Sequence, residues 1–206
     1  RGMKTLQIRM SKISETALRL AEFLEGHKKI KNVFYPGLES HPDHQNALKY
    51  LKNKFGHVSW ERVISGPGLT SIYEFLKSRE PNRESPWMNE ALTKENDHSN
   101  TIANAGINKK CELASEALNL FVDLYGCEAG NMALKLMSTG GLFVGGGIAP
   151  KLLPILKTGI FMHSFLDKGR MRQALESIPI HIVLNDMAAL LGAAWWGNQE
   201  HLNNQS

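Results

Sequence analysis

The sequence GGLFVGGGIAP spans residues 140–150 and indicates how the C-terminal third of the chain folds. Residues 141–144 are a short apolar run, typical of a buried strand, that leads directly into three consecutive glycines. Pro150 lies where a helix over 150–158 would make its first turn, and there a missing N–H breaks no helical hydrogen bond. The pattern therefore predicts a strand, a tight glycine turn and a helix.

A second unit of the same kind follows. Residues 178–184 are another apolar run, and the small residues of 187–196 predict a helix after it. Continuously apolar strands joined by helices are typical of parallel sheets that are covered on both faces. We therefore expect an α/β fold at this end of the chain.

Upstream, apolar residues recur at the three- and four-residue spacing of helices. This spacing predicts helices over 3–25, 47–55, 69–76 and 111–136. Residues 33–35 indicate a short strand, 40–44 a polar turn, and 65–68 a turn that leads into a helix. Because residues 77–109 are polar and contain prolines, we expect a loop-rich excursion there with one helix near 88–93.

The composition excludes several classes of protein. The chain has 206 residues, with 24 Lys and Arg against 20 Asp and Glu and a formal net charge of +4. Its 42% of hydrophobic residues is typical of an ordinary globular domain. Its basic residues form no single stripe, so we expect no nucleic-acid partner. No run approaches the roughly 20 apolar residues that cross a bilayer, and no signal-peptide core follows the first residues. We therefore expect a cytoplasmic protein without a membrane partner.

Metal and redox chemistry have little support. Cys111 and Cys127 are too few and too far apart for a disulfide framework or a CxxC pair. His41, Asp43 and His44 are of metal-binding types, but they do not form a pattern such as HExxH. We predict no metal ligand among them.

The glycine run Gly145, Gly146 and Gly147 is the first candidate for ligand binding. Residues without side chains let a ligand approach the backbone, and a following helix N-terminus favours polar or negative groups. Contact with phosphate or adenosine is one interpretation, and a tight turn in the core is the other. The run matches neither GxxxxGK[ST] nor GxGxxG.

Two carboxylates are further candidates. Glu61 lies shortly before the turn at 65–68 and could accept hydrogen bonds from sugar hydroxyls, although an exposed glutamate is more often simply solvated. The pair Asn185-Asp186 follows the second strand and could place a general base there. We favour instead a turn that caps the last helix.

Most of the chain resembles the C-terminal part of bacterial-type glucokinases. The resemblance covers about residues 46–197 and is most specific in FGHVSWERVISGPGL, residues 55–69. It continues through AGNMAL (129–134), GGLFVGGGIAP (140–150), KGR (168–170) and LLGAA (190–194).

Residues 1 to about 44 resemble a different family, the trans-sulfuration PLP enzymes of the cystathionine γ-synthase and methionine γ-lyase type. The similar pieces are RGMKTL (1–6), AEFL (21–24) and VFYPGLESHPDH (33–44). The sequence thus predicts a chimeric chain with three parts: a helix and strand segment at 1–45, a glucokinase-like lobe at 46–198 and a polar tail at 199–206.

The glucokinase resemblance implies a fold and a set of site residues. It implies the C-terminal lobe of an actin-like (ribonuclease H-like) α/β sugar kinase, with glucose, ATP and Mg²⁺ as reaction partners. In this family Glu61 would contact the sugar, and Gly145, Gly146 and Gly147 would lie on the adenosine side. Ser65 and Gly66 would lie between them and also contact the nucleotide.

Important family motifs are not found in the sequence. The family's Asn-Asp general base, its DxGGT phosphate loop and its EGGH sugar contact belong to an N-terminal lobe, so we assign no catalytic residue and expect impaired or absent activity in this chain alone. The S-x-T-K lysine of PLP enzymes has only Ala91-Leu92-Thr93-Lys94 as an approximation, so bound PLP is not expected. The alternatives to a glucokinase are a non-catalytic interaction module, with a second copy or an N-terminal lobe as its partner, and a PLP-enzyme fragment.

Overall fold

The computed structural model describes residues 6–30 and 42–203, and the chain divides into two compact units, 1–58 and 59–206. The first unit contains helices α1 (Leu6–Glu25) and α2 (Pro42–Phe55). The helix expected over 3–25 is thus confirmed over its described residues, and the strand expected at 33–35 lies outside them. The polar turn expected at 40–44 was wrong for 42–44, which begin α2, because a proline that lacks an N–H fits the first position of a helix.

The second unit is mainly helical. Its elements, in order, are the 3₁₀ turn η2 (Trp60–Arg62), α3 (Gly66–Arg79), the 3₁₀ turn η3 (Pro81–Arg83), α4 (Pro86–Lys94), α5 (His98–Ile107), α6 (Glu112–Leu136), β1 (Leu142–Val144), α7 (Ile148–Lys151), α8 (Leu153–Leu156), α9 (Ile160–Leu166), the 3₁₀ turn η4 (Gly169–Met171), α10 (Arg172–Glu176), β2 (Ile180–Ile182) and α11 (Ala188–Asn203).

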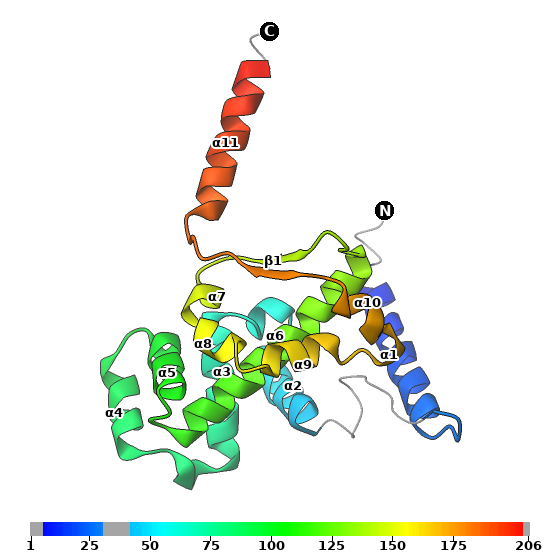
Figure 1. Cartoon of the computed structure of the whole chain (residues 1–206). Helices are drawn as coiled ribbons and strands as arrows, with labels where there is room; N and C mark the ends of the chain where they lie inside the picture. Colours follow the sequence, from blue (N-terminus) through cyan, green and yellow to red (C-terminus); the bar gives the residue numbers. More distant parts are fainter. Residues whose placement is uncertain (1–5, 31–41, 204–206) are drawn as a thin grey trace. The chain divides into compact units, whose positions relative to one another are not determined.

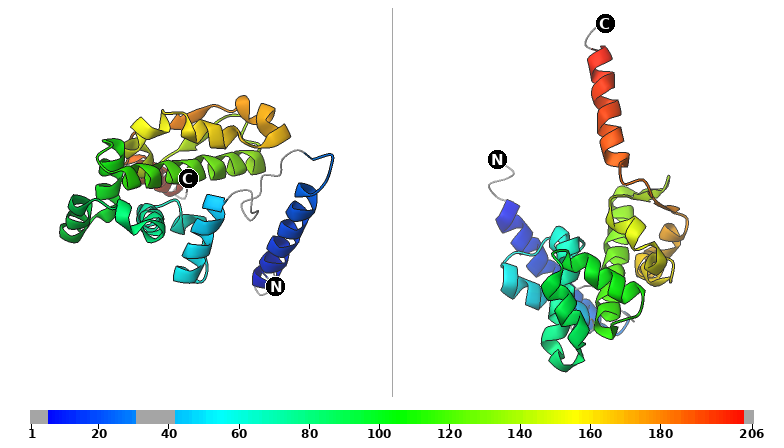
Figure 2. Two further views of the ribbon diagram at one scale, coloured as in Figure 1. Left: turned by 90° about the horizontal axis from the view of Figure 1, so that it is seen from below. Right: turned by 90° about the vertical axis from the view of Figure 1, so that its left-hand side faces the viewer.

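Helix α6 is the centre of this unit, and the prediction of a helix over 111–136 is confirmed. Helices α3, α5 and α9 pack against it (Figure 1). The left view of Figure 2 shows α9 lying along α6. The side chains of Phe121 and Leu118 from α6, Tyr73 from α3 and Ile102 from α5 are almost fully buried between these helices. The hydrophobic core is therefore built around one long helix.

The loop-rich excursion expected over 77–109 was wrong, because most of these residues are helical, but the helix expected near 88–93 is confirmed by α4. Pro86 begins α4, and the Asp97 side chain caps α5 by accepting a hydrogen bond from the backbone N–H of Asn100 at 3.0 Å. Ile102 and Ala105 are the buried residues of a helix whose other face is polar. A polar, proline-containing stretch thus folds because its few apolar residues meet α6.

The two strands pair in parallel, as expected (Figure 1), with Leu142 opposite Ile180 and Val144 opposite Ile182. The expectation that both faces would be covered is wrong for these strands. Phe143 is 67% exposed, and its ring stacks on that of His181 with 4.8 Å between the ring centroids. Side chains alternate between the two faces of a strand, so only the Leu142 and Val144 side turns toward the helices.

The helix expected over 150–158 is divided. It begins earlier, at Ile148, and is interrupted at Leu152, after which Pro154 lies in the first turn of α8. A proline inside a helix has no N–H for the ladder, so the chain starts a new turn there. The last helix is longer than the expected 187–196, because α11 continues to Asn203.

Candidate functional site

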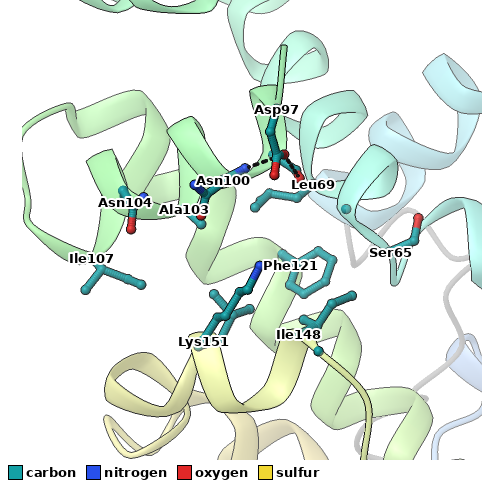
Figure 3. A pocket seen from close by; sticks show the side chains of 14 residues that line it. Ser65, Leu69, Asp97, Asn100, Ala103, Asn104, Ile107, Phe121, Ile148 and Lys151 are labelled. Carbon is teal, nitrogen blue, oxygen red and sulfur yellow. Dashed lines mark hydrogen bonds between the residues drawn. The ribbon is translucent and has the colours of Figure 1, made fainter. Parts of the chain in front are cut away.

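A cavity of about 530 Å³ lies inside the second unit, between the N-terminus of α3, one face of α5, the middle of α6 and helix α7 (Figure 3). Its lining joins segments that are far apart in the sequence. Three of the predicted ligand-binding residues are among them: Ser65, Gly66 and Gly147. The structure thus brings the SGPG turn and the glycine run to one place.

Ser65 and Gly66 form the start of α3. The Ser65 hydroxyl caps the helix by accepting a hydrogen bond from the backbone N–H of Gly68 at 3.1 Å, and its own hydrogen is left to donate. A Cβ atom on Gly66 would lie 3.0 Å from the Ser99 side-chain oxygen, so a glycine lets the ends of α3 and α5 approach closely. The predicted turn at 65–68 is therefore the first turn of a helix.

The three glycines after β1 differ in their surroundings. Gly147 lines the cavity as the residue before α7, whereas Gly145 and Gly146 do not line it. Gly146 has a φ of +91°, a left-handed conformation that glycine adopts without strain. The run therefore combines a backbone turn at Gly146 with a lining position at Gly147.

Helix α5 supplies the polar wall of the cavity. Asp97 accepts hydrogen bonds at Oδ1 from the Ser99 hydroxyl, at 2.7 Å, and from the Asn100 N–H. The Ser99 hydrogen bond, the Asn100 N–H and the nearby charge of Lys151 keep the pKa of Asp97 below its usual value. Asp97 is therefore an ionised acceptor at neutral pH.

The rest of the lining is largely apolar. Leu69 from α3, Phe121 from α6 and Ile148 from α7 meet in the interior of the cavity (Figure 3). Lys151 extends from α7 with its ammonium group directed into the cavity. An apolar interior with a few polar groups on one wall is the usual construction of a small-molecule site.

The other candidate residues lie elsewhere. Glu61 is exposed on η2 and is not among the residues that line the cavity. The side-chain oxygen of Asn185 accepts a hydrogen bond from the Met187 N–H at 2.9 Å, just before α11. The Asn185-Asp186 pair thus forms the turn before the last helix, as the favoured interpretation had it.

Sequence reasoning missed the lining residues Asp97, Ser99, Asn100, Asn104 and Lys151. For α5 the missed signal was an N-cap aspartate, followed by polar residues three and seven positions later on one helix face. Reading that spacing would have indicated both the helix and its polar side.

Comparisons with known proteins place the chain in a family. The family model for glucokinase matches residues 39–200, and the model for Cys/Met metabolism PLP-dependent enzymes matches residues 1–74. The glucokinase of Synechocystis sp. is 46% identical over 159 residues, which cover 71% of this chain and 45% of that protein. The glucokinase of Photorhabdus laumondii is 33% identical over 178 residues, 82% of this chain and 51% of that protein.

Among solved structures, a glucokinase from an Antarctic psychrotroph superimposes with a TM-score of 0.61 at 33% identity. The superposition covers 73% of this chain and 44% of that one. The fold is thus part of an α/β kinase lobe of the actin-like class. The chain belongs to the glucokinase family.

The chain spans about half the length of the curated relatives it matches. Its resemblance to two families is confirmed, and the two family models overlap at residues 39–74. The domain boundaries expected at 45 and 198 stay predictions. Within residues 6–30 and 42–203, no helix has the length and apolar character needed to cross a membrane.

Proposed function

We propose that this chain is the nucleotide-holding lobe of a kinase that transfers the γ-phosphoryl group of ATP to the 6-hydroxyl of glucose. One observation carries the proposal: Ser65, Gly66 and Gly147, which the family resemblance assigns to the nucleotide, line one cavity although they come from distant segments. Its size and apolar interior suit the nucleoside part of ATP.

Each wall of the cavity has groups that can contact a nucleoside. The second carboxylate oxygen of Asp97 can accept a hydrogen bond from a ribose hydroxyl, and the Ser65 hydroxyl can donate one. Gly147 leaves the backbone open to a ligand, because no atom lies within 4 Å of the position of a Cβ there. Glu61, exposed on η2, would accept hydrogen bonds from sugar hydroxyls outside this cavity.

Phosphoryl transfer needs groups that we do not assign to this sequence. The Asn-Asp base and the DxGGT phosphate loop of the family would come from an N-terminal lobe that this sequence does not include. Among the described residues, no three His, Cys, Asp or Glu side chains gather to hold a metal ion, so we assign no residue of this chain to Mg²⁺. Binding of the nucleoside is thus the step that this lobe performs.

PLP chemistry is not part of the proposal. The match to the PLP-dependent family ends at residue 74, and the nearest approximation to the cofactor lysine, Lys94, lies beyond it. Lys94 is exposed at the end of α4, where it pairs with Glu90.

Ligand-detected NMR with ATP and with adenosine tests the proposal. We expect both to bind weakly, with Kd on the order of millimolar, and with similar affinity, because the lobe holds the nucleoside and not the phosphates. Gly147→Leu should abolish the signal. Gly147 has an ordinary backbone conformation, unlike Gly146, so this change fills space without straining the turn.

The matched control is Gly140→Leu, an exposed glycine with the same open surroundings that does not line the cavity. It should leave binding unchanged. Much tighter binding of ATP than of adenosine would reveal a phosphate site in this lobe. If neither compound binds, the proposal fails and a non-catalytic interaction module becomes the better interpretation.

A further inference from the structure

Two carboxamide side chains stand side by side on the polar wall of the cavity. Asn100 and Asn104 both line it from α5 and lie four residues, about one helical turn, apart. In the described part of the chain, these two residues form hydrogen bonds only through their backbones: the Asn100 N–H donates to Asp97, and the Asn104 carbonyl accepts from the Asn108 side chain. Their carboxamides are therefore placed to meet a ligand.

The position of these groups matches the edge of a flat ring. In Figure 3, Asn104 and Ile107 lie at the end of the cavity opposite Ser65, with the Phe121 ring between them. A nucleoside with its ribose near Ser65 and Asp97 would place its base at the Asn104 end. The apolar interior would contact the faces of that base, and the carboxamides would meet its edge.

A carboxamide presents one donor group and one acceptor group side by side. Adenine offers the complementary pair, an acceptor ring nitrogen next to its 6-amino donor, and asparagine pairs with it through two hydrogen bonds. A purine with a 6-oxo group offers two acceptors there, which suit a cationic side chain instead. Asn100 and Asn104 would therefore discriminate between the two.

We infer that Asn100 and Asn104 make this cavity selective for purines with a 6-amino group over purines with a 6-oxo group. The inference rests on the proposed function, because it requires the cavity to bind the nucleoside. Lys151 also lines the cavity, and its ammonium group could instead favour a 6-oxo purine by donating a hydrogen bond to the oxo group. The positive charge of Lys151 is attracted to the carboxylate of Asp97. This attraction favours a position of the ammonium group near Asp97, where the ribose would lie.

The test compares AMP with IMP, which share ribose and phosphate and differ in the amino or oxo group of the base. Ligand-detected NMR titrations are made on the full chain, on Asn100→Leu and on Asn104→Leu. Leucine has the same number of side-chain heavy atoms as asparagine, branched at the same carbon, but no hydrogen-bonding group. Both positions are exposed, so the helix should fold in each variant.

We expect the unmodified chain to bind AMP about tenfold more tightly than IMP. Each variant should lose about tenfold in AMP affinity and most of the preference for AMP. The control is Asn89→Leu, an exposed residue of α4 that does not line the cavity, and it should change neither affinity.

The possible results separate the two proposals. Equal binding of AMP and IMP that neither asparagine variant alters overturns the inference and leaves the proposed function in place. Tighter binding of IMP overturns it in favour of Lys151 as the group that contacts the base. If neither nucleotide binds, both proposals are overturned.

Discussion

Glycines in two regions of this molecule have opposite surroundings, tightly packed in one and open in the other. In α6, a Cβ atom on Gly126 would lie 2.3 Å from the backbone oxygen of Phe161, and one on Gly130 would lie 2.5 Å from that of Phe165. In the turn after β1, Gly146 and Gly147 have no atom within 4 Å of that position. The helix needs glycine so that α9 can pack against it, whereas the turn leaves space unfilled.

The difference shows how to interpret a glycine in a sequence of this kind. A glycine in the middle of a long helix weakens that helix, so its presence indicates a close approach by another backbone. Several glycines between a strand and a helix indicate either backbone geometry or room for a ligand. Here both occur in adjacent residues, since Gly146 has the positive φ and Gly147 lines the cavity.

Substitution in the packed helix should have the largest effect. We expect Gly126→Ala to lower the free energy of unfolding by about 3 kcal/mol, because a methyl group cannot fit against the Phe161 backbone unless α6 and α9 separate. Urea denaturation measures the change. The control Gly192→Ala, in α11 with open surroundings, should be neutral or slightly stabilising. Equal effects of the two changes would remove the basis of the comparison.

Within the turn, the two neighbouring glycines should respond differently. Gly146→Ala forces a non-glycine residue to a φ of +91° and should cost about 1–2 kcal/mol. Gly147→Ala, at a φ of −74°, should change the stability by less than about 0.5 kcal/mol. The same urea titrations compare them. A larger loss at Gly147 would mean that the turn is packed and not open.

An effect smaller than that of Gly126→Ala is expected at the polar wall of the cavity, and it should depend on pH. The pKa of Asp97 is lowered in the folded chain, first by the Ser99 hydroxyl and then by the Asn100 N–H. The stabilisation is therefore present above the unfolded pKa of about 3.9 and is lost as the pH falls through the lower folded value. Asp97→Ala should lower the melting temperature at pH 7 by less than Gly126→Ala does.

Thermal melts of the unmodified chain and Asp97→Ala at pH 7, 5 and 3 check this prediction. The difference should be the same at pH 7 and 5 and smaller at pH 3. A difference that grows at low pH would contradict the assigned sign. A loss as large as that of Gly126→Ala would show that the cavity wall is part of the packed core.

Parts of the site could be predicted from local sequence. The SGPG turn and the glycine run each bear a local pattern, and both family resemblances rest on stretches that remain recognisable by themselves. Helix α5 was missed because its apolar side has few residues, and Ile102 and Ala105 are buried only where α6 covers them. Its one local signal was the Asp97 N-cap with the polar residues that follow it. Without that helix, the polar wall of Asp97, Asn100 and Asn104 was missed.

By itself, the sequence determined the long helix α6, the parallel pairing of two strand-helix units and the membership of the glucokinase family. These depend on periodicity and motifs within short stretches, where the residues that set the backbone are neighbours in the chain. Only the tertiary structure decided that Gly147, and neither Gly145 nor Gly146, lines the cavity with Ser65 and Gly66. That choice depends on how closely α3, α5 and α7 approach across α6, and side chains far apart in the sequence fix those distances by packing.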